Sequence, residues 1–239
     1  MHLAFATASG LTDFVPEPIR PSEVKRWTDK IAMRAERVFE NLRQRRDSFS
    51  EADRPLVDRM LTQQAVLCER LEALLPQHPD SLNIRHHGDF NLARSLIVKD
   101  DIFITGFKGD LRLGIEERRR KAPAARDVAS LIRSIEHSAN AALERALNFA
   151  PDEHGRLAAA LAEWVNRASE AFLATYREFM TNLSLWPEDH AAAARMLDFF
   201  LLEKIFDELE SDLAQRPERV RPSLAGALRI LSSRIYEAT

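Results

Sequence analysis

The chain has 239 residues, of which 45% are hydrophobic and 30% are charged. This composition is typical of a globular protein and excludes a disordered chain, which would lack the apolar surface needed to offset the entropy of ordering. The 34 basic and 37 acidic residues give a formal net charge of -3, so no basic excess indicates a nucleic-acid partner.

The first residues of the chain bear on its predicted cellular location, and the single cysteine bears on whether it can form a disulfide. Residues 1–6 contain no lysine or arginine and too short an apolar run for a signal peptide. No run of about 18 apolar residues is present to span a bilayer, so we expect a cytoplasmic protein without a membrane partner. Cys68 is alone, which excludes an intrachain disulfide, and its apolar neighbours predict a buried thiol on a helix.

The first 80 residues have a helical pattern after an extended proline-rich segment at 14–21. Ser22 resembles an N-cap, and the residues after it form an apolar stripe at helical spacing: Trp27, Ile31, Val38 and Leu42. A second helix is predicted from near Ser50 to Leu74, closed by the prolines at 76 and 79.

The stretch from 82 to 114 differs from the helices around it. Residues 95–98 and 102–105 are short β-branched runs with three polar residues between them, which predicts a β-hairpin. Further helices are predicted over about 125–147, from Asp152 to Phe179, over about 187–214 and over 217–236. The pattern indicates one mostly helical domain with an embedded hairpin.

Glycine is scarce, with 7 in the chain, and this bears on nucleotide binding. A loop that cradles phosphates needs glycines at close spacing so that backbone N–H groups can approach the anion. The closest group is Gly106, Gly109 and Gly114, which fits neither a dinucleotide-binding nor a P-loop pattern. No nucleotide-binding loop is therefore predicted.

A loop with two histidines, a glycine and an aspartate precedes the predicted hairpin. A His-Gly-Asp tripeptide ahead of two short strands is the layout of a phosphotransferase catalytic loop. In that chemistry Asp89 would accept the proton of the attacking hydroxyl, while His87 would brace the loop. The alternative is a plain connection between a helix and a strand with surface histidines. His86 and His87 are adjacent and point in different directions, so they make a poor metal pair.

Residues 85–94 resemble the catalytic loop RxHGDYHLGQ of maltokinases, including the maltokinase-like domains fused to trehalose synthase. These proteins are relatives of the aminoglycoside phosphotransferases in the protein-kinase-like superfamily. Further segments resemble the family in the same order along the chain: residues 2–6, 16–18, 117–123, 126–134, 201–204 and 216–224.

The resemblance implies a mainly α (α+β) fold, namely a protein-kinase-like C-terminal lobe with a helical bundle and one small hairpin after the catalytic-type loop. We expect residues 1–239 to form a single domain of this kind. The N-terminal ATP-binding lobe of the family is expected to be absent, because the chain begins where that lobe would end.

Three positions depart from the family at its metal ligands. The glutamine five residues after the catalytic aspartate is Arg94, the chelating aspartate is Gly106, and the next carboxylate is Lys108. Magnesium requires oxygen ligands, and cationic side chains repel it, so no metal site is expected. Arg94 and Lys108 are instead predicted to pair with Asp89 or to contact an anion.

Other residues favour structural roles. The mixed-charge run at 116–121 indicates a structural network rather than a nucleic-acid patch, and Arg126 and Asp127 predict an ion pair that anchors the following helix under the loop. Trp164 and Trp186 lie among apolar helix positions and are predicted to pack, although an exposed tryptophan would be a candidate for sugar stacking.

Three functions remain open at this point. The first, which we favour, is a non-catalytic binding or regulatory module in maltose or trehalose metabolism, with a sugar ligand or with trehalose synthase or another α-glucan enzyme as partner; no cofactor is then expected. The second is part of an ATP- and magnesium-dependent kinase of maltose or another small molecule, whose N-terminal lobe is a separate chain. The third is a homodimer formed through an uncovered apolar surface.

Overall fold

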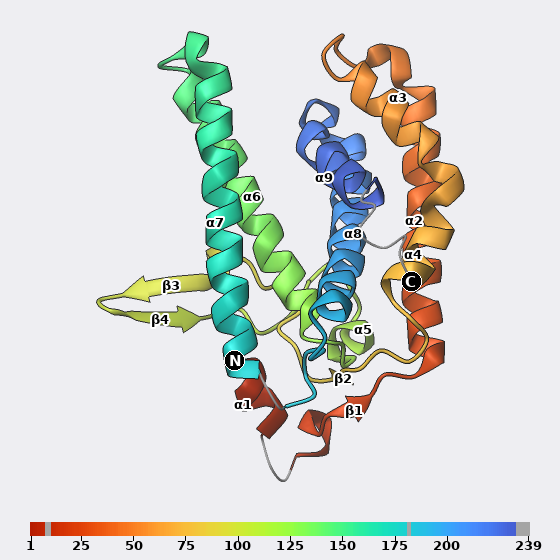
Figure 1. Cartoon of the computed structure of the whole chain (residues 1–239), viewed down its shortest axis with the longest axis vertical. Helices are drawn as coiled ribbons and strands as arrows, with labels where there is room; N and C mark the ends of the chain where they lie inside the picture. The colour runs from red at the N-terminus through yellow and green to blue at the C-terminus, as the bar shows by residue number, and fades with distance from the viewer. Residues whose placement is uncertain (8–10, 181–182, 233–239) are drawn as a thin grey trace. The chain divides into compact units, whose positions relative to one another are not determined.

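The computed structural model describes residues 1–7, 11–180 and 183–232 (Figure 1). The chain is mainly helical with two small antiparallel sheets, which confirms the predicted fold class. It divides into two compact units, the first made of Met1–Pro18 and Asp80–Glu188 and the second of Ile19–Pro79 and Asp189–Thr239. The single domain predicted for the whole chain stays a prediction, and each unit is described by itself.

The second unit is a helical bundle around the long helices α2 and α8, which pack along each other (Figure 1). Aromatic side chains join them, with ring centroids 5.7 Å apart for Trp27 and Phe200 and 6.2 Å apart for Phe39 and Phe206. The elements of this unit are α2 (Pro21–Gln44), η2 (Arg46–Ser48), α3 (Arg54–Thr62), η3 (Gln64–Val66), α4 (Leu67–Leu74), α8 (His190–Gln215), η6 (Pro217–Arg219) and α9 (Arg221–Leu231).

The helix predicted from Ser50 to Leu74 is wrong in its continuity, because the 3-10 turn η3 separates α3 from α4. The buried thiol predicted at Cys68 is also wrong, since this side chain is exposed. Leu67, Leu71 and Leu74 are the residues of α4 that face the core. Cys68 follows Leu67 by about 100° around the helix axis, and this rotation carries it out of the buried face.

The first unit holds the hairpin, a pair of long helices and several short elements. The helices α6 and α7 run side by side (Figure 1). The elements are α1 (His2–Thr7), η1 (Thr12–Phe14), β1 (Glu17–Pro18), β2 (Leu82–Asn83), η4 (Leu92–Arg94), β3 (Ser95–Val98), β4 (Asp101–Ile104), α5 (Ile115–Arg119), α6 (Ala125–Leu147), η5 (Pro151–Glu153) and α7 (His154–Met180).

The first residues of two helices are set by local capping and differ from those that the apolar periodicity predicted. The helix predicted from Ser22 begins at Pro21, after Arg20 as N-cap, because proline favours the first helical position. The helix predicted from about 187 begins at His190, where the Asp189 carboxylate accepts a hydrogen bond from the Ala192 N–H at 2.6 Å. The helix predicted over 125–147 is confirmed, and the predicted end of the last helix at 236 lies outside the described residues.

The predicted hairpin is confirmed as β3 and β4, paired in antiparallel register with Leu96 opposite Phe103 and Ile97 opposite Ile102. Its two-residue turn contains Lys99 at φ 56°, a left-handed conformation that tight hairpin turns require. A second small sheet pairs β1 with β2. Among the described residues, no helix combines the length and apolar character needed to cross a membrane.

We predict that Phe206→Ala lowers the free energy of unfolding by about 3–5 kcal/mol, because Phe206 is fully buried against Phe39 and its loss leaves a cavity. Urea unfolding followed by circular dichroism measures this change. Met33→Ala, at a side chain that is 55% exposed, is the control and should shift stability by no more than about 0.5 kcal/mol. Equal effects of the two variants would contradict the packing described for this unit.

Candidate functional site

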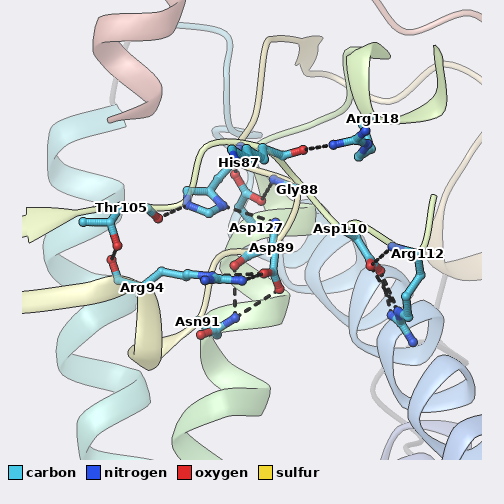
Figure 2. Close-up of polar contacts among 11 residues, drawn as sticks. His87, Gly88, Asp89, Asn91, Arg94, Thr105, Asp110, Arg112, Arg118 and Asp127 are labelled. Atoms are coloured by element: carbon cyan, nitrogen blue, oxygen red, sulfur yellow. Dashed lines mark hydrogen bonds and ion pairs between the residues drawn. The ribbon is translucent and has the colours of Figure 1, made fainter. Parts of the chain in front are cut away.

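Within the first unit, Asp127, the third residue of α6, holds the loop from Arg85 to Arg94 against this helix (Figure 2). One carboxylate oxygen of Asp127 accepts a hydrogen bond from the His87 N–H at 2.6 Å, and the other accepts one from the Gly88 N–H at 2.9 Å. Asp127 therefore joins α6 to the loop, and it does so through backbone amides; the ion pair with Arg126 that the sequence suggested stays a prediction.

The anchor is a buried anion. Burial raises the pKa of the Asp127 carboxyl, but a hydrogen bond from His2, nearby positive charge and the loop amide outweigh burial and lower this pKa to about 2. The carboxylate therefore stays ionised over the physiological range and keeps accepting both amide hydrogen bonds.

His2 completes a buried network that the sequence did not predict. Its Nε2 lies 3.0 Å from Asp127 Oδ2, and its Nδ1 lies 2.7 Å from the Tyr176 hydroxyl. Burial, aided by the Asp127 charge, raises the pKa of Tyr176 well above its usual range, so the phenol remains a hydrogen-bond donor. The network ties α1 and α7 to the residue that holds the loop.

His87 braces the loop from within, as predicted. Its Nε2 lies 2.8 Å from the Thr105 carbonyl oxygen, and its Nδ1 accepts a hydrogen bond from the Asp89 N–H at 3.2 Å. These contacts select the tautomer with the proton on Nε2. The ring also packs against Phe90 and Phe107, with centroids 5.6 and 5.0 Å away. His87 thus links the loop to the strand end at Thr105.

Asp89, the catalytic-type residue, is paired with Arg94 (Figure 2). Its Oδ2 accepts hydrogen bonds from Arg94 Nε at 3.0 Å and Nη2 at 2.5 Å. Its Oδ1 accepts one from the Asn91 side-chain amide at 3.1 Å. Both carboxylate oxygens therefore already have protein donors, and the predicted pairing of Arg94 with Asp89 is confirmed.

Gly106 makes room for Arg94. A Cβ atom at position 106 would lie 2.9 Å from Arg94 Cδ, closer than such atoms approach, and in a tight contact of 3.1 Å with Nε. The backbone of Gly106 also has φ +83°, a conformation that disfavours most side chains. A side chain at 106 would therefore force Arg94 to shift from its place beside Asp89.

Lys108 does not join Arg94 at Asp89, so the predicted pair of Lys108 with Asp89 is wrong in this structure. The Lys108 side chain is exposed, and its carbonyl oxygen accepts a hydrogen bond from Arg118 Nη1 at 2.9 Å. The neighbouring carboxylate, Asp110, pairs with Arg112 at 2.7 Å (Figure 2). The charged run at 116–121 forms a structural network, as predicted, through Arg118 and an ion pair of Glu117 with Arg120.

The side chains present do not fit the magnesium ion that the family resemblance would require. Arginine at 94, glycine at 106 and lysine at 108 supply no side-chain oxygen, and the Asp89 oxygens already accept protein hydrogen bonds. Within residues 1–7, 11–180 and 183–232, no three His, Cys, Asp or Glu side chains are grouped closely enough to hold a metal ion.

The two tryptophans on this unit differ. Trp186 is buried and its ring meets that of Tyr176 edge-on at 5.2 Å, so its predicted packing role is confirmed. Trp164 is half exposed on α7, so the packing predicted for it is incomplete. The loop contacts described above include neither ring.

The stability of the loop should depend on pH through His86. Burial lowers the pKa of His86 from 6.5 to about 4, although the Asp127 charge opposes this effect, and its Nδ1 is buried with no hydrogen-bond partner in the described residues. Between these pH values the unfolded chain binds the proton more strongly, so stability falls as pH falls from 6.5 to 4. We predict a loss on the order of 3 kcal/mol over this range.

Urea unfolding at a series of pH values measures this dependence. The His86→Gln variant removes the titrating ring, so its stability should change less over the same interval. Equal pH dependence of the variant and the unchanged chain would contradict the burial described for His86.

No family model matches the sequence. Solved structures of glucosamine kinase match it at 20% identity, one crystal form with a TM-score of 0.66 over 97% of this chain and 50% of its own chain. A glucosamine kinase in complex with glucosamine, ADP and inorganic phosphate matches with a TM-score of 0.65 over 99% of this chain and 54% of its own. The chain therefore spans about half the length of these kinases. Its fold is similar to the fold of the half that it matches.

Proposed function

We propose that this chain is a non-catalytic module with the fold of a sugar-kinase C-terminal lobe, in which Arg94 takes the place of a metal ion at the catalytic-type aspartate. The observation that carries the proposal is the pair of hydrogen bonds from Arg94 Nε and Nη2 to Asp89 Oδ2. The module would bind a sugar or a partner enzyme rather than transfer a phosphoryl group.

The chemistry of a general base supports this proposal. A catalytic aspartate must present a free lone pair to the substrate hydroxyl in order to accept its proton. Asp89 Oδ2 already accepts two hydrogen bonds from a guanidinium, which is charged at all physiological pH values. A substrate hydroxyl would have to displace Arg94 or approach Oδ1 beside Asn91.

Electrostatics support it as well. A unit charge about 4 Å from a cation contributes roughly 4 kcal/mol of repulsion per cation charge at an effective dielectric near 20. The Arg94 guanidinium in direct contact with Asp89 therefore disfavours a divalent ion at the same carboxylate. Because the guanidinium neutralises Asp89, the loop would need no metal ion to offset this charge.

The resemblance to maltokinases and the fold of glucosamine kinases both favour a sugar as ligand. We propose maltose or a related glucoside, or an amino sugar, as the ligand class. Trehalose synthase or another α-glucan enzyme in the cytoplasm is the proposed partner.

The alternative is part of an ATP-dependent sugar kinase that takes its nucleotide-binding lobe from another chain. One observation favours it: Asp89 still lies on a loop that Asp127 and His87 hold in a defined conformation. On this alternative, Arg94 would leave Asp89 when ATP and magnesium bind.

Two measurements separate these functions. Phosphoryl transfer from ATP with magnesium is assayed with maltose and with glucosamine, and binding of each sugar is measured by isothermal titration calorimetry. We predict binding of a sugar without transfer. Formation of a sugar phosphate would contradict the non-catalytic proposal, and Asp89→Asn is the control that assigns any activity to the loop.

Magnesium should not raise the melting temperature of the unchanged chain, since the side chains that the structure describes supply no suitable oxygen cluster. The variant Arg94→Gln/Gly106→Asp restores side-chain oxygens at two positions, so magnesium should raise its melting temperature. Differential scanning calorimetry with and without magnesium measures both. A clear magnesium shift in the unchanged chain would contradict the proposed loss of the metal site.

The same variants test the steric link between positions 94 and 106. Gly106→Asp alone should lower stability by about 1–3 kcal/mol, because its Cβ overlaps Arg94 and the backbone is left-handed. Adding Arg94→Gln should recover part of this loss, and Arg94→Gln alone is the control. Urea unfolding measures the free energy of unfolding of each variant. If the losses of the two single variants simply add in the double variant, the steric overlap between positions 94 and 106 is contradicted.

A further inference from the structure

The hairpin of β3 and β4 exposes apolar side chains on both of its faces. Ile97 and Ile102 share one face and are 79% and 64% exposed. Leu96, Val98 and Phe103 lie on the other face and are about half exposed. A two-stranded hairpin is marginally stable in water, and a contiguous exposed apolar patch marks a site of association. The hairpin therefore has the properties of an interaction surface.

The outer edge of β3 is open to another strand. The turn has two residues, so the flanking pair Val98 and Asp101 exchanges backbone hydrogen bonds, and alternation then directs the Ile97 N–H and carbonyl outward. The strand reads Ser-Leu-Ile-Val and lacks the charge, proline or bulge that protects edge strands. On the β4 edge, in contrast, the Asp101 carboxylate accepts the Ile102 N–H at 2.8 Å.

We propose that two copies of this chain pair through their β3 edges, antiparallel and about a two-fold axis at Ile97. Ile97 then lies opposite Ile97 of the partner subunit, and the two hairpins form one four-stranded sheet. Pairing an edge strand with its own copy satisfies the outward backbone groups of both chains. This assembly does not depend on the proposed function of the loop.

The side chains in this register suit a second copy. One face gains a continuous row of four isoleucines, two from Ile97 and two from Ile102, since these residues are already paired within each hairpin. On the other face Leu96 lies opposite Val98 of the partner subunit. The same register places the tip residues Lys99 and Asp100 of one hairpin opposite Ser95 and Arg94 of the partner subunit.

Light scattering after size-exclusion chromatography tests the assembly. We expect the unchanged chain to have the mass of a dimer and Ile97→Lys to have the mass of a monomer, because the lysine charge would lie beside its own copy at the two-fold axis. Phe149→Lys, at a side chain that is 90% exposed outside the hairpin, is the matched control and should stay dimeric. A monomeric unchanged chain at every soluble concentration would overturn the proposal.

Cysteine cross-linking tests the register, in a Cys68→Ser background that removes the native thiol. Directly opposed residues in a hydrogen-bonded pair have Cα atoms about 5.5 Å apart, within the range of a disulfide. Ile97→Cys should therefore form a covalent dimer on mild oxidation. Ile102→Cys should not, because three strand spacings, about 14 Å, would separate the two thiols. Cross-linking of Ile102→Cys but not of Ile97→Cys, or of neither, would overturn the β3 pairing.

Discussion

The candidate site depends on one buried anion, the Asp127 carboxylate. It accepts hydrogen bonds from two successive amides of the loop and from His2, and each of these donors would cost free energy if it were buried without a partner. Because the amides of His87 and Gly88 are held there, His87 reaches Thr105 and the backbone places Asp89 beside Arg94. The geometry of the loop is thus set from α6.

Within the loop that Asp127 holds, positions 94 and 106 together determine which group contacts the Asp89 carboxylate. Arg94 contributes charge and two donors to Asp89, while Gly106 leaves the space that the arginine side chain fills. A carboxylate at 106 would need that space, so replacing one residue alone leaves either an overlap or a gap. On the proposed function, this pair would let the loop keep its conformation without metal ligands.

The local features of the fold could be predicted from the sequence, and the long-range contacts could not. Apolar periodicity indicated the helix over 125–147, and two β-branched runs indicated the hairpin. The contacts of His2 with Asp127 and Tyr176 span 125 and 174 residues, and no local pattern encodes them. Cys68 was misplaced because an apolar neighbourhood does not specify which residue faces the core. Arg94 was placed at Asp89 from the family resemblance, whereas Lys108, predicted on the same basis, is exposed.

The central claim of the proposed function is that Arg94, and not a divalent ion, occupies Oδ2 of Asp89. A crystal structure grown with magnesium and a non-hydrolysable ATP analogue tests this claim most directly. The account predicts that Arg94 Nε and Nη2 remain on Asp89 Oδ2 with no metal between them. A magnesium ion bound to Asp89, with the arginine displaced, would contradict it.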